Sequence, residues 1–327
     1  MDRKGLKGIG LFPVAVAIAL LLWSAAGLAA DYPARSIRMV VPYTPGGATD
    51  AAARLISERL GRRVGQPVVV ENKPGAGALI GSDQVAKAPP DGYMLLVHSS
   101  ALSVVPAVTA KMPFDPATDL TQIALLAELP LVFAASNAVP ANNVKDLIAY
   151  MKAHPNELNY GAYGITGTPN ILMILFNQRA GVTSTLITYK GAGQAMPEMI
   201  AGRLHLMFDG ATSSVPLARS GRIKLLAVLS AQRSPLLPDV PSLSETLSGV
   251  VGESWLGIAG PKGLPAPIVN QLNREINAVL QEQDLVAAMR EQMLVVKTTT
   301  PQGLLAQVQR EVAYWLAATK QANIQPE

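Results

Sequence analysis

Two loops of this sequence place glycines just before the predicted start of a helix, an arrangement that suits a bound anion. The first, residues 44–50, follows an apolar run and contains no lysine or arginine. Glycines let the backbone turn sharply, and a helix start adds unpaired N–H donors and a partial positive charge. Such a loop can hold a carboxylate without a cation, and the alternative is an ordinary turn capped by Thr49 or Asp50. The candidate ligand-binding residues are Thr44, Pro45, Gly46, Gly47, Ala48, Thr49 and Asp50.

The second loop, residues 161–170, has the same form in a later part of the chain. It precedes a predicted helix, with Thr168 as the expected N-cap and Pro169 at the favoured first helical position. A plain helix start without a ligand is again the alternative. If the two halves of the chain face each other, both helix starts converge on one cleft. The candidate ligand-binding residues here are Ala162, Tyr163, Gly167, Thr168, Pro169 and Asn170.

Three further polar residues follow predicted strands. Ser99 and Ser100 end one apolar run, and Asp209 ends another. In open α/β sheets, ligands bind outside the carboxyl ends of the strands, so these hydroxyl and carboxylate groups are candidate ligand contacts. Their alternative role is to cap the helices that follow.

Other kinds of chemistry find little support. The spacing of Gly75, Gly77 and Gly81 resembles a dinucleotide fingerprint, but the next predicted strand ends in serines where that fold needs an acidic residue. His98 and Ser99 would point to opposite faces of a strand, which disfavours a hydrolytic pair. The chain has no G-x-S-x-G, Walker A or H-E-x-x-H motif and no cysteine. We therefore expect no catalytic residues, no metal site and no cofactor.

Short apolar runs alternate with helical patterns after residue 30, which predicts an α/β protein. The first three strands are separated by helices, and this predicts a parallel sheet with right-handed crossovers. Helices are also expected over residues 144–153 and 194–201, and three more close the chain. The expected strands are residues 37–41, 68–70, 94–97, 131–134, 158–160, 186–189, 206–208, 225–229 and 255–259.

Two places interrupt this alternation without resembling flexible linkers. One lies near residues 128–130, after a stretch around residues 113–122 that we expect to be irregular. The other lies near residues 248–253. They predict a discontinuous first lobe, residues 31–130 plus 254–327, and a second lobe, residues 131–253.

The first thirty residues have the order of a secretory signal peptide. Arg3, Lys4 and Lys7 precede an apolar run over residues 11–22, and small residues follow up to Ala30. The run is short for a membrane-spanning helix of ~20 residues, so we expect a cleaved signal over residues 1–30 and an exported protein. Without this segment the net charge falls from +4 to +2, which leaves no electrostatic footprint for nucleic acid.

Short motifs spread over the whole chain after residue 30 carry a resemblance to one family of proteins. They are Tyr32-Pro33-Ala34-Arg35, Val41-Pro42-Tyr43-Thr44-Pro45-Gly46-Gly47-Ala48-Thr49-Asp50, Gln66-Pro67-Val68-Val69-Val70-Glu71-Asn72-Lys73-Pro74-Gly75-Ala76-Gly77, Ala88-Pro89-Pro90-Asp91-Gly92-Tyr93, Tyr189-Lys190-Gly191-Ala192, Met207-Phe208-Asp209 and Leu237-Pro238-Asp239-Val240-Pro241. With these motifs the chain resembles the Bug family, the substrate-binding proteins of tripartite tricarboxylate transporters.

This resemblance implies a type II periplasmic-binding-protein fold, with two α/β lobes, a hinge and a ligand cleft between them. It implies a periplasmic receptor, rather than an enzyme, whose two helix-start loops hold a carboxylate. The ligands implied are dicarboxylates, tricarboxylates, acidic amino acids and aromatic acids, and the partners are the inner-membrane permease subunits of such a transporter. We expect the receptor to be a monomer.

The sequence departs from the family pattern at Tyr163, Ile171 and Gly210, where small residues, a histidine and an asparagine are common. These departures leave the identity of the ligand open. Two other functions also stay open, namely a sensor that passes ligand occupancy to a signalling partner and an exported hydrolase that uses the same cleft.

Overall fold

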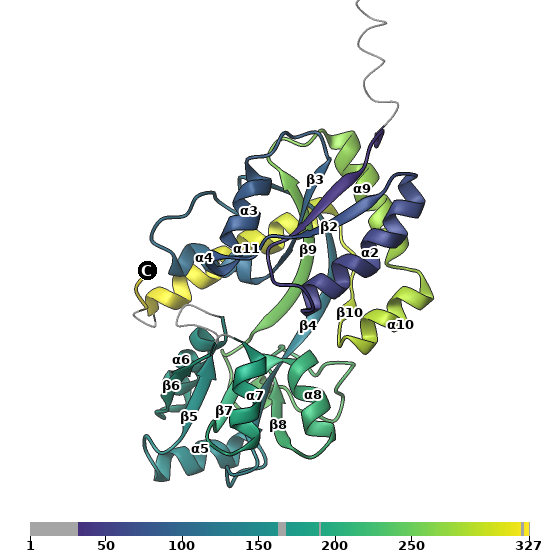
Figure 1. Ribbon diagram of the computed structural model, residues 1–327. Coiled ribbons are helices and arrows are strands. Elements are labelled where there is room, and N and C mark those ends of the chain that lie inside the picture. Colours follow the sequence, from purple (N-terminus) through teal and green to yellow (C-terminus); the bar gives the residue numbers. More distant parts are fainter. Residues whose placement is uncertain (1–31, 163–167, 190, 322–323, 327) are drawn as a thin grey trace, which may run out of the picture.

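The computed structural model describes residues 32–162, 168–189, 191–321 and 324–326, which form two α/β lobes that share one mixed sheet (Figure 1). The strands are β1 (Ile37–Val41), β2 (Val68–Asn72), β3 (Met94–Ser99), β4 (Leu120–Ser136), β5 (Asn159–Ala162), β6 (Thr185–Thr188), β7 (Leu206–Gly210), β8 (Ile223–Val228), β9 (Glu253–Pro261) and β10 (Val295–Val296). The helices are α2 (Ala48–Val64), α3 (Leu79–Ala86), α4 (Ala101–Val108), α5 (Val144–Ala153), α6 (Thr168–Ala180), α7 (Ala192–Ile200), α8 (Ala211–Arg219), α9 (Ala266–Val279), α10 (Gln283–Glu291) and α11 (Pro301–Gln321), with short 3₁₀ turns η1 (Ala76–Ala78) and η2 (Leu243–Glu245).

Strand β4 runs through both lobes and pairs with strands of each. Residues 120–130 of β4 pair with β9, and residues 131–136 pair with β7 and β8 instead. The path through the sheet is β2-β1-β3-β9-β4-β7-β5-β6. We call β1–β3, β9, β10, residues 120–130 and helices α2–α4 and α9–α11 lobe 1. Lobe 2 comprises residues 131–136, strands β5–β8 and helices α5–α8.

The chemistry of the chain explains why these segments form these elements. Strand β1 is apolar except for Arg38, and Ile37, Met39 and Val41 are fully buried. Burying each such side chain stabilises the fold by roughly 1.5–3 kcal/mol. Helix α2 buries one stripe that includes Ile56 and Leu60, and it ends at Gly65, whose left-handed backbone (φ 71°) favours glycine.

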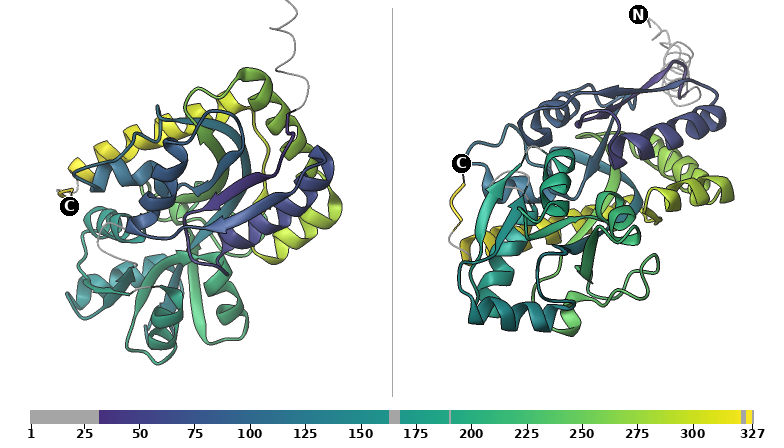
Figure 2. Two further views of the ribbon diagram at one scale, coloured as in Figure 1. Left: turned by 45° about the horizontal axis from the view of Figure 1, so that its top comes forward. Right: turned by 60° about the horizontal axis from the view of Figure 1, so that its bottom comes forward.

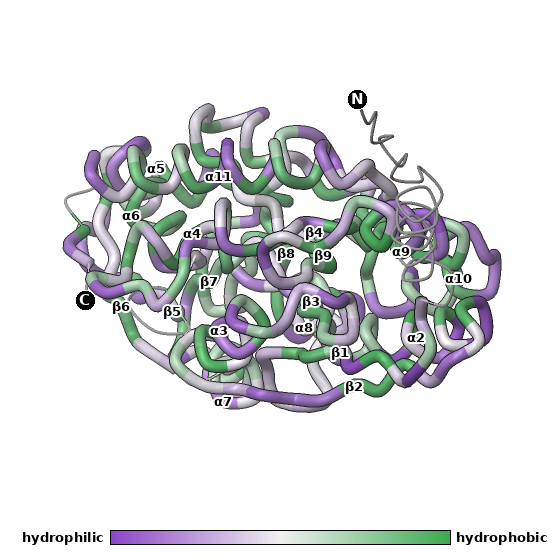
Figure 3. Tube along the Cα trace, turned by 90° about the horizontal axis from the view of Figure 1, so that it is seen from above, coloured by the Kyte–Doolittle hydropathy of each residue, from purple (hydrophilic) through white to green (hydrophobic). Residues whose placement is uncertain are grey.

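Each lobe has its own hydrophobic core. In lobe 1 the core lies between the sheet and helices α2, α9 and α10, and in lobe 2 it surrounds the edge-to-face rings of Phe133, Phe176 and Phe208. Figure 3 shows hydrophobic segments gathered along the strands and hydrophilic segments at the outer rim near α2 and α10. This arrangement is the one expected when helices cover both faces of a sheet.

The lobes are also held together away from the sheet. The end of α11 lies against lobe 2, where Trp315 and Ala318 belong to the same buried cluster as Phe176 (Figures 1 and 2). On another side, Met293 of lobe 1 packs among the lobe 2 residues of a small apolar cluster, and the Thr212 hydroxyl donates to the Gln292 carbonyl at 3.0 Å. Lobe 2 is therefore tied to lobe 1 by several segments of the chain.

Most of the predicted elements occur near their predicted positions, with one correction. The stretch around residues 113–122 is not irregular to its end, because β4 begins at Leu120. The interruption predicted near residue 130 is a change of strand partners within one continuous strand. The predicted signal peptide, residues 1–30, lies outside the described residues.

Candidate functional site

The register of the strands places the carboxyl ends of both sets of parallel strands at the junction of the lobes. Strand β4 leaves lobe 1 at Pro130 and enters lobe 2 at Leu131, which pairs with Gly210 at the end of β7. Strands β5 and β6 run parallel to β7, so they end at the same edge. In lobe 1, Ser99 at the end of β3 pairs with Leu256 near the start of β9, and β1 and β2 run parallel to β3. The two edges therefore face each other across the crossover (Figure 1).

The loop after β1 ends in an uncapped helix start. Helix α2 begins at Ala48 and its N-cap is Gly47, which has no side chain to cap it. The alternative of Thr49 or Asp50 as the N-cap is therefore wrong. The amides of Gly47, Ala48 and Thr49 have no acceptor among the described residues. Residues 44–47 are exposed, so this helix start presents free donors and a partial positive charge to the junction.

Asp50 is bonded within the protein. Its carboxylate is buried and accepts hydrogen bonds from the Gly46 amide (3.0 Å), the Arg54 guanidinium (3.0 Å) and the Asn72 amide group (2.9 Å). Burial alone would raise the pKa of Asp50, but these donors outweigh it and lower the pKa. Asn72 also donates to the Tyr43 carbonyl, so the carboxylate ties the loop to β1 and β2. Asp50 thus shapes the loop and neutralises Arg54.

Replacing Asp50 with asparagine is expected to lower the free energy of unfolding by about 1–3 kcal/mol, because charge-assisted hydrogen bonds from three donors are lost. Chemical unfolding of the two proteins measures this difference. The matched change Arg54→Gln removes an exposed partner, whose ion pair is screened by solvent, and is expected to cost less than Asp50→Asn. Equal losses in both variants would show that the ion pair, rather than the bonds to the loop, is what stabilises the fold.

The end of β3 supplies hydroxyl groups beside the α2 loop. The Ser99 hydroxyl lies 2.7 Å from that of Tyr43 and accepts from the Ala101 amide, so Ser99 helps to cap α4. Ser100 is buried and lies 3.4 Å from the Ser254 hydroxyl, at the start of β9. Burial raises the pKa of Tyr43, which keeps its phenol protonated. The sequence did not predict Tyr43 as a ligand contact, although it lies within the shared motif over residues 41–50.

His98 points away from this edge, as the alternation along β3 predicted. It is buried, its ring contacts Trp255 edge to face, and its Nε2 atom lies 3.1 Å from the Gln122 side-chain oxygen. Burial lowers its pKa to about 4, against the hydrogen bond to Gln122. A neutral core histidine on the opposite face of the strand cannot activate Ser99.

The pKa of His98 has a consequence for stability. The unfolded chain takes up this proton near pH 6.5, whereas the folded protein does so at about pH 4. The contribution of neutral His98 to the free energy of unfolding is thus fully present above about pH 6.5. As the pH falls toward 4, this contribution decreases by up to about 1.4 kcal/mol per pH unit. His98→Phe is expected to flatten the pH dependence of urea unfolding in that range. An unchanged slope would mean that other groups cause the acid sensitivity.

Lobe 2 contributes the second helix start. Ala162 ends β5, and α6 begins at Thr168, so Thr168 is the first helical residue and not the predicted N-cap. Asn170 is buried and accepts from the Tyr160 hydroxyl at 2.8 Å, whereas Thr168 and Pro169 are partly exposed. Tyr163 and Gly167 lie outside the described residues.

Two further segments of lobe 2 end at the same edge. Asp209 is buried near the end of β7, and its carboxylate accepts from the hydroxyls of Ser213 and Ser214 in α8. After β6, helix α7 begins with Gly191 as an N-cap that has no side chain to cap it. We did not predict this third helix start as a ligand contact, although the motif at residues 189–192 marked its position.

A metal cluster and a membrane-spanning helix are both absent from the described residues. These residues include no group of three or more His, Asp or Glu residues placed to hold a metal ion. None of the helices in this part of the chain is long and apolar enough to cross a membrane. The arrangement is thus a set of helix starts, hydroxyls and buried carboxylates around the junction of two lobes, which can bind an anion by hydrogen bonds and dipoles.

Comparison with known proteins bears on this site. Residues 52–324 match the family described as the tripartite tricarboxylate transporter family receptor. The periplasmic binding protein BugD is 33% identical, with a TM-score of 0.78 over 90% of this chain and all of BugD. The protein Rpa4515 of R. palustris, solved with adipate, is 34% identical, with a TM-score of 0.82 over 91% of this chain and all of the other. MatC from Rhodopseudomonas palustris, solved with bound malate, is 30% identical, with a TM-score of 0.75 over 88% of this chain and 99% of MatC.

These likenesses confirm the predicted fold class. The two α/β lobes, joined by strands that cross between them, have the type II fold of periplasmic binding proteins, with a hinge and a ligand cleft at the junction.

Proposed function

This chain belongs to the tripartite tricarboxylate transporter receptor family, as its motifs predicted, and from this premise we propose that it is a periplasmic receptor for a small dicarboxylate. Two structurally similar proteins, Rpa4515 and MatC, were solved with adipate and with malate, and each of these ligands has two carboxylates. The single observation that carries the proposal is the pair of facing edges, each with helix starts that lack side-chain caps. One carboxylate would lie at the start of α2 and the other at the starts of α6 and α7.

The hydrogen-bond donors at the start of α2 and near Ser99 suffice for micromolar affinity. A charge-assisted hydrogen bond contributes ~1.5–3 kcal/mol, and a micromolar complex needs about 8 kcal/mol. The three unpaired amides of Gly47, Ala48 and Thr49, together with the hydroxyls near Ser99, reach this range without a guanidinium clamp. Such binding is reversible, which delivery to a second protein requires.

The ligand contacts we propose are the residues predicted from the sequence, with the roles that their contacts support. Thr44, Pro45, Gly46, Gly47, Ala48 and Thr49 form the first anion site, Asp50 holds that loop in shape, and Ser99 and Ser100 add hydroxyls. Ala162, Tyr163, Gly167, Thr168, Pro169 and Asn170 form the second site, and Asp209 orients Ser213 and Ser214 beside it.

We propose that the two lobes close around the ligand as rigid units. Lobe 1 then comprises residues 31–130 and 254–327, and lobe 2 comprises residues 131–253. This division is supported by the change of partners along β4 between Pro130 and Leu131. Bending at that point moves one edge toward the other, and the closed form presents a different outer surface. We propose that permease subunits of a tripartite tricarboxylate transporter recognise that surface on a monomeric receptor.

Export and the lack of catalysis are parts of the same proposal. Residues 1–30 would direct the chain to the periplasm and be removed, and cell fractionation with N-terminal sequencing tests this. A receptor returns its ligand unchanged, so NMR of a dicarboxylate after long incubation with the protein is expected to show no new species. Turnover would instead favour an exported enzyme.

The decisive experiment compares matched acids with the chain from residue 31 onward. Adipate or malate at 100 times its Kd is expected to stabilise the protein by about 2.7 kcal/mol, or roughly 5–10 °C in Tm. Hexanoate, which has the chain length of adipate but one carboxylate, is expected to bind about 10- to 100-fold more weakly. The monomethyl ester of adipic acid keeps the size and removes one charge, and it should resemble hexanoate. Equal affinity for adipate and hexanoate would exclude a second anion site, and a panel without any dicarboxylate response would exclude the proposal.

A further inference from the structure

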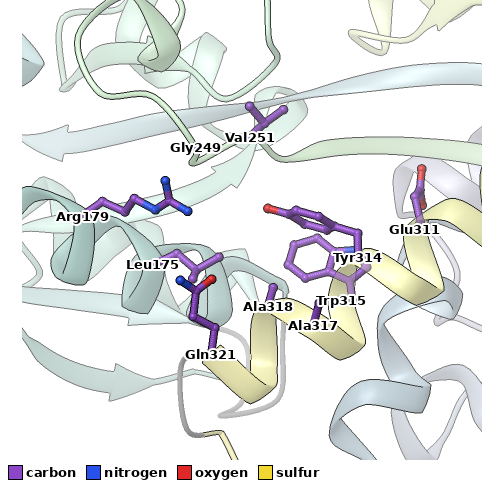
Figure 4. Close-up of a pocket in the computed structure, with 10 residues that line it drawn as sticks. All are labelled: Leu175, Arg179, Gly249, Val251, Glu311, Tyr314, Trp315, Ala317, Ala318 and Gln321. Carbon is purple, nitrogen blue, oxygen red and sulfur yellow. The ribbon is translucent and has the colours of Figure 1, made fainter.

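A cavity of about 460 Å³ lies between α11 of lobe 1 and α6 of lobe 2, closed on a third side by residues 249–251 (Figure 4). Its walls include Leu175, Val251, Tyr314 and Trp315. Small-molecule sites in proteins have volumes of ~300–1,000 Å³ and mostly apolar walls with a few placed polar groups. This cavity fits that description.

The cavity is separate from the ligand cleft. Trp255 donates from its indole nitrogen to Glu311, which lines the cavity, at 2.6 Å. The same ring packs against His98, and side chains alternate along a strand. The neighbouring Ser99 therefore points to the other face of the sheet, where it contacts Tyr43 at the cleft. The cavity and the cleft lie on opposite sides of the crossing strands.

Two aromatic rings form one wall of the cavity. Tyr314 and Trp315 are adjacent on α11, with ring centroids 5.1 Å apart at an angle of 75°. Trp315 is buried, whereas Tyr314 is 43% exposed, so its ring is accessible to a bound molecule. Figure 4 shows the Tyr314 ring extending across the middle of the cavity, where a second flat ring can pack against it.

One end of the cavity carries the positive charge of Arg179. Arg179 lies at that end, and no carboxylate among the described residues pairs with it. Its guanidinium lies against the backbone of Gly249, where a Cβ atom would come within 2.1 Å of Nη1. Gly249 also has a left-handed backbone (φ 82°), so glycine makes room for the guanidinium there. Glu311 lies at the far end, where its carboxylate accepts from Trp255 and Gln307.

We propose that this cavity is a second binding site, for a small amphipathic monocarboxylate with an aromatic body. The carboxylate pairs with Arg179, a planar donor suited to it, and the apolar body lies against Tyr314 and between Leu175 and Val251. The asymmetry of the cavity supports this choice. Arg179, which has no carboxylate partner among the described residues, lies at one end, and the Glu311 carboxylate at the other end accepts from Trp255 and Gln307. The walls between these two ends are mostly apolar. The site does not depend on the cleft or on its ligand.

The test uses 2-naphthoate as the probe and the chain from residue 31 onward, with binding followed by calorimetry in the presence of saturating adipate. Binding at millimolar or lower concentration is expected, and 2-naphthamide, which lacks the charge, is expected to bind about 10- to 100-fold more weakly. Arg179→Gln should cause a similar loss for 2-naphthoate. Ala317→Trp places a ring in the cavity and should abolish binding, whereas Ala287→Trp on an exposed part of α10 should leave it unchanged.

The outcomes separate this site from the cleft. A variant with a blocked cleft, Gly47→Asp, is expected to bind 2-naphthoate as well as the natural chain does. If Gly47→Asp abolishes naphthoate binding and Ala317→Trp does not, the probe binds in the cleft and the proposal is wrong. No binding of 2-naphthoate to any variant, with each variant folded by circular dichroism, also overturns it. Neither result would alter the conclusion drawn from adipate and hexanoate.

Discussion

Gly47→Asp is expected to remove dicarboxylate binding while the protein stays as stable as before. Gly47 is the N-cap of α2, its backbone (φ −83°, ψ 170°) suits any residue, and a Cβ atom there would meet nothing within 4 Å. Aspartate is a favoured N-cap, so its side chain would accept from the amides that we assign to the ligand. Losing two charge-assisted bonds costs about 3–6 kcal/mol of binding, or roughly 10²- to 10⁴-fold in Kd.

The matched control for this change is Gly47→Asn, which caps the same amides without a charge. We expect asparagine to weaken binding by about tenfold, because a neutral hydrogen bond is easier to displace. Calorimetric titration gives the Kd values, and urea unfolding should give stabilities within about 0.5 kcal/mol of the natural chain, since exchanging glycine for a better cap changes stability by only a few tenths. If Gly47→Asp binds adipate within a factor of about three, the start of α2 is not an anion site.

Phe133→Ala is expected to have the largest effect on folding. Phe133 is fully buried on the lobe 2 half of β4 and packs edge to face against Phe176 and Phe208, with centroids 5.1 and 4.6 Å away. Removing a buried phenylalanine costs about 3–5 kcal/mol, and edge-to-face pairs add to this. Phe133→Leu fills most of the space and should cost about 1–2 kcal/mol.

Urea unfolding, followed by the fluorescence of Trp255 and Trp315, measures this loss. Trp315 belongs to lobe 1 but shares a buried cluster with Phe133, so its signal should change in the same transition as the circular dichroism. A loss below about 1 kcal/mol for Phe133→Ala would mean that the cavity collapses, in contrast to the usual behaviour of such sites. Two separated transitions would instead show that the lobes unfold independently.

Much of the fold followed from local patterns, because those patterns have local causes. The apolar run of β1 and the stripe of α2 each predict one element, and their positions agree with the structure within a few residues. The start of β4 was missed because its first residues, Leu120 and Gln122, are stabilised by pairing with β9 more than a hundred residues later. Pairing with so distant a strand produces no recognisable pattern in the sequence near Leu120.

The candidate site was predictable where it depends on the backbone. Glycines before a helix predicted a helix start at residues 44–50, and the structure has that start at Ala48, with Gly47 as an N-cap that has no side chain. The partners of Asp50 were not predictable, since Asn72 reaches it from another strand and Arg54 from the next helical turn. A carboxylate that looked available for ligand is in fact engaged by the protein. The start of α7 was not predicted as part of the site, because the motif at residues 189–192 indicated only the family.

The position of β9 in the sheet affects how the chain folds during its synthesis. β9 lies between β3 and β4, yet it is translated after every strand of lobe 2. A chain that emerges from its amino end can therefore complete lobe 2 while β3 and β4 still have unpaired edges. Open edges invite pairing with other chains, and contacts between distant segments form slowly. Chaperone binding during synthesis should thus be concentrated on lobe 1, and it should end when β9 inserts.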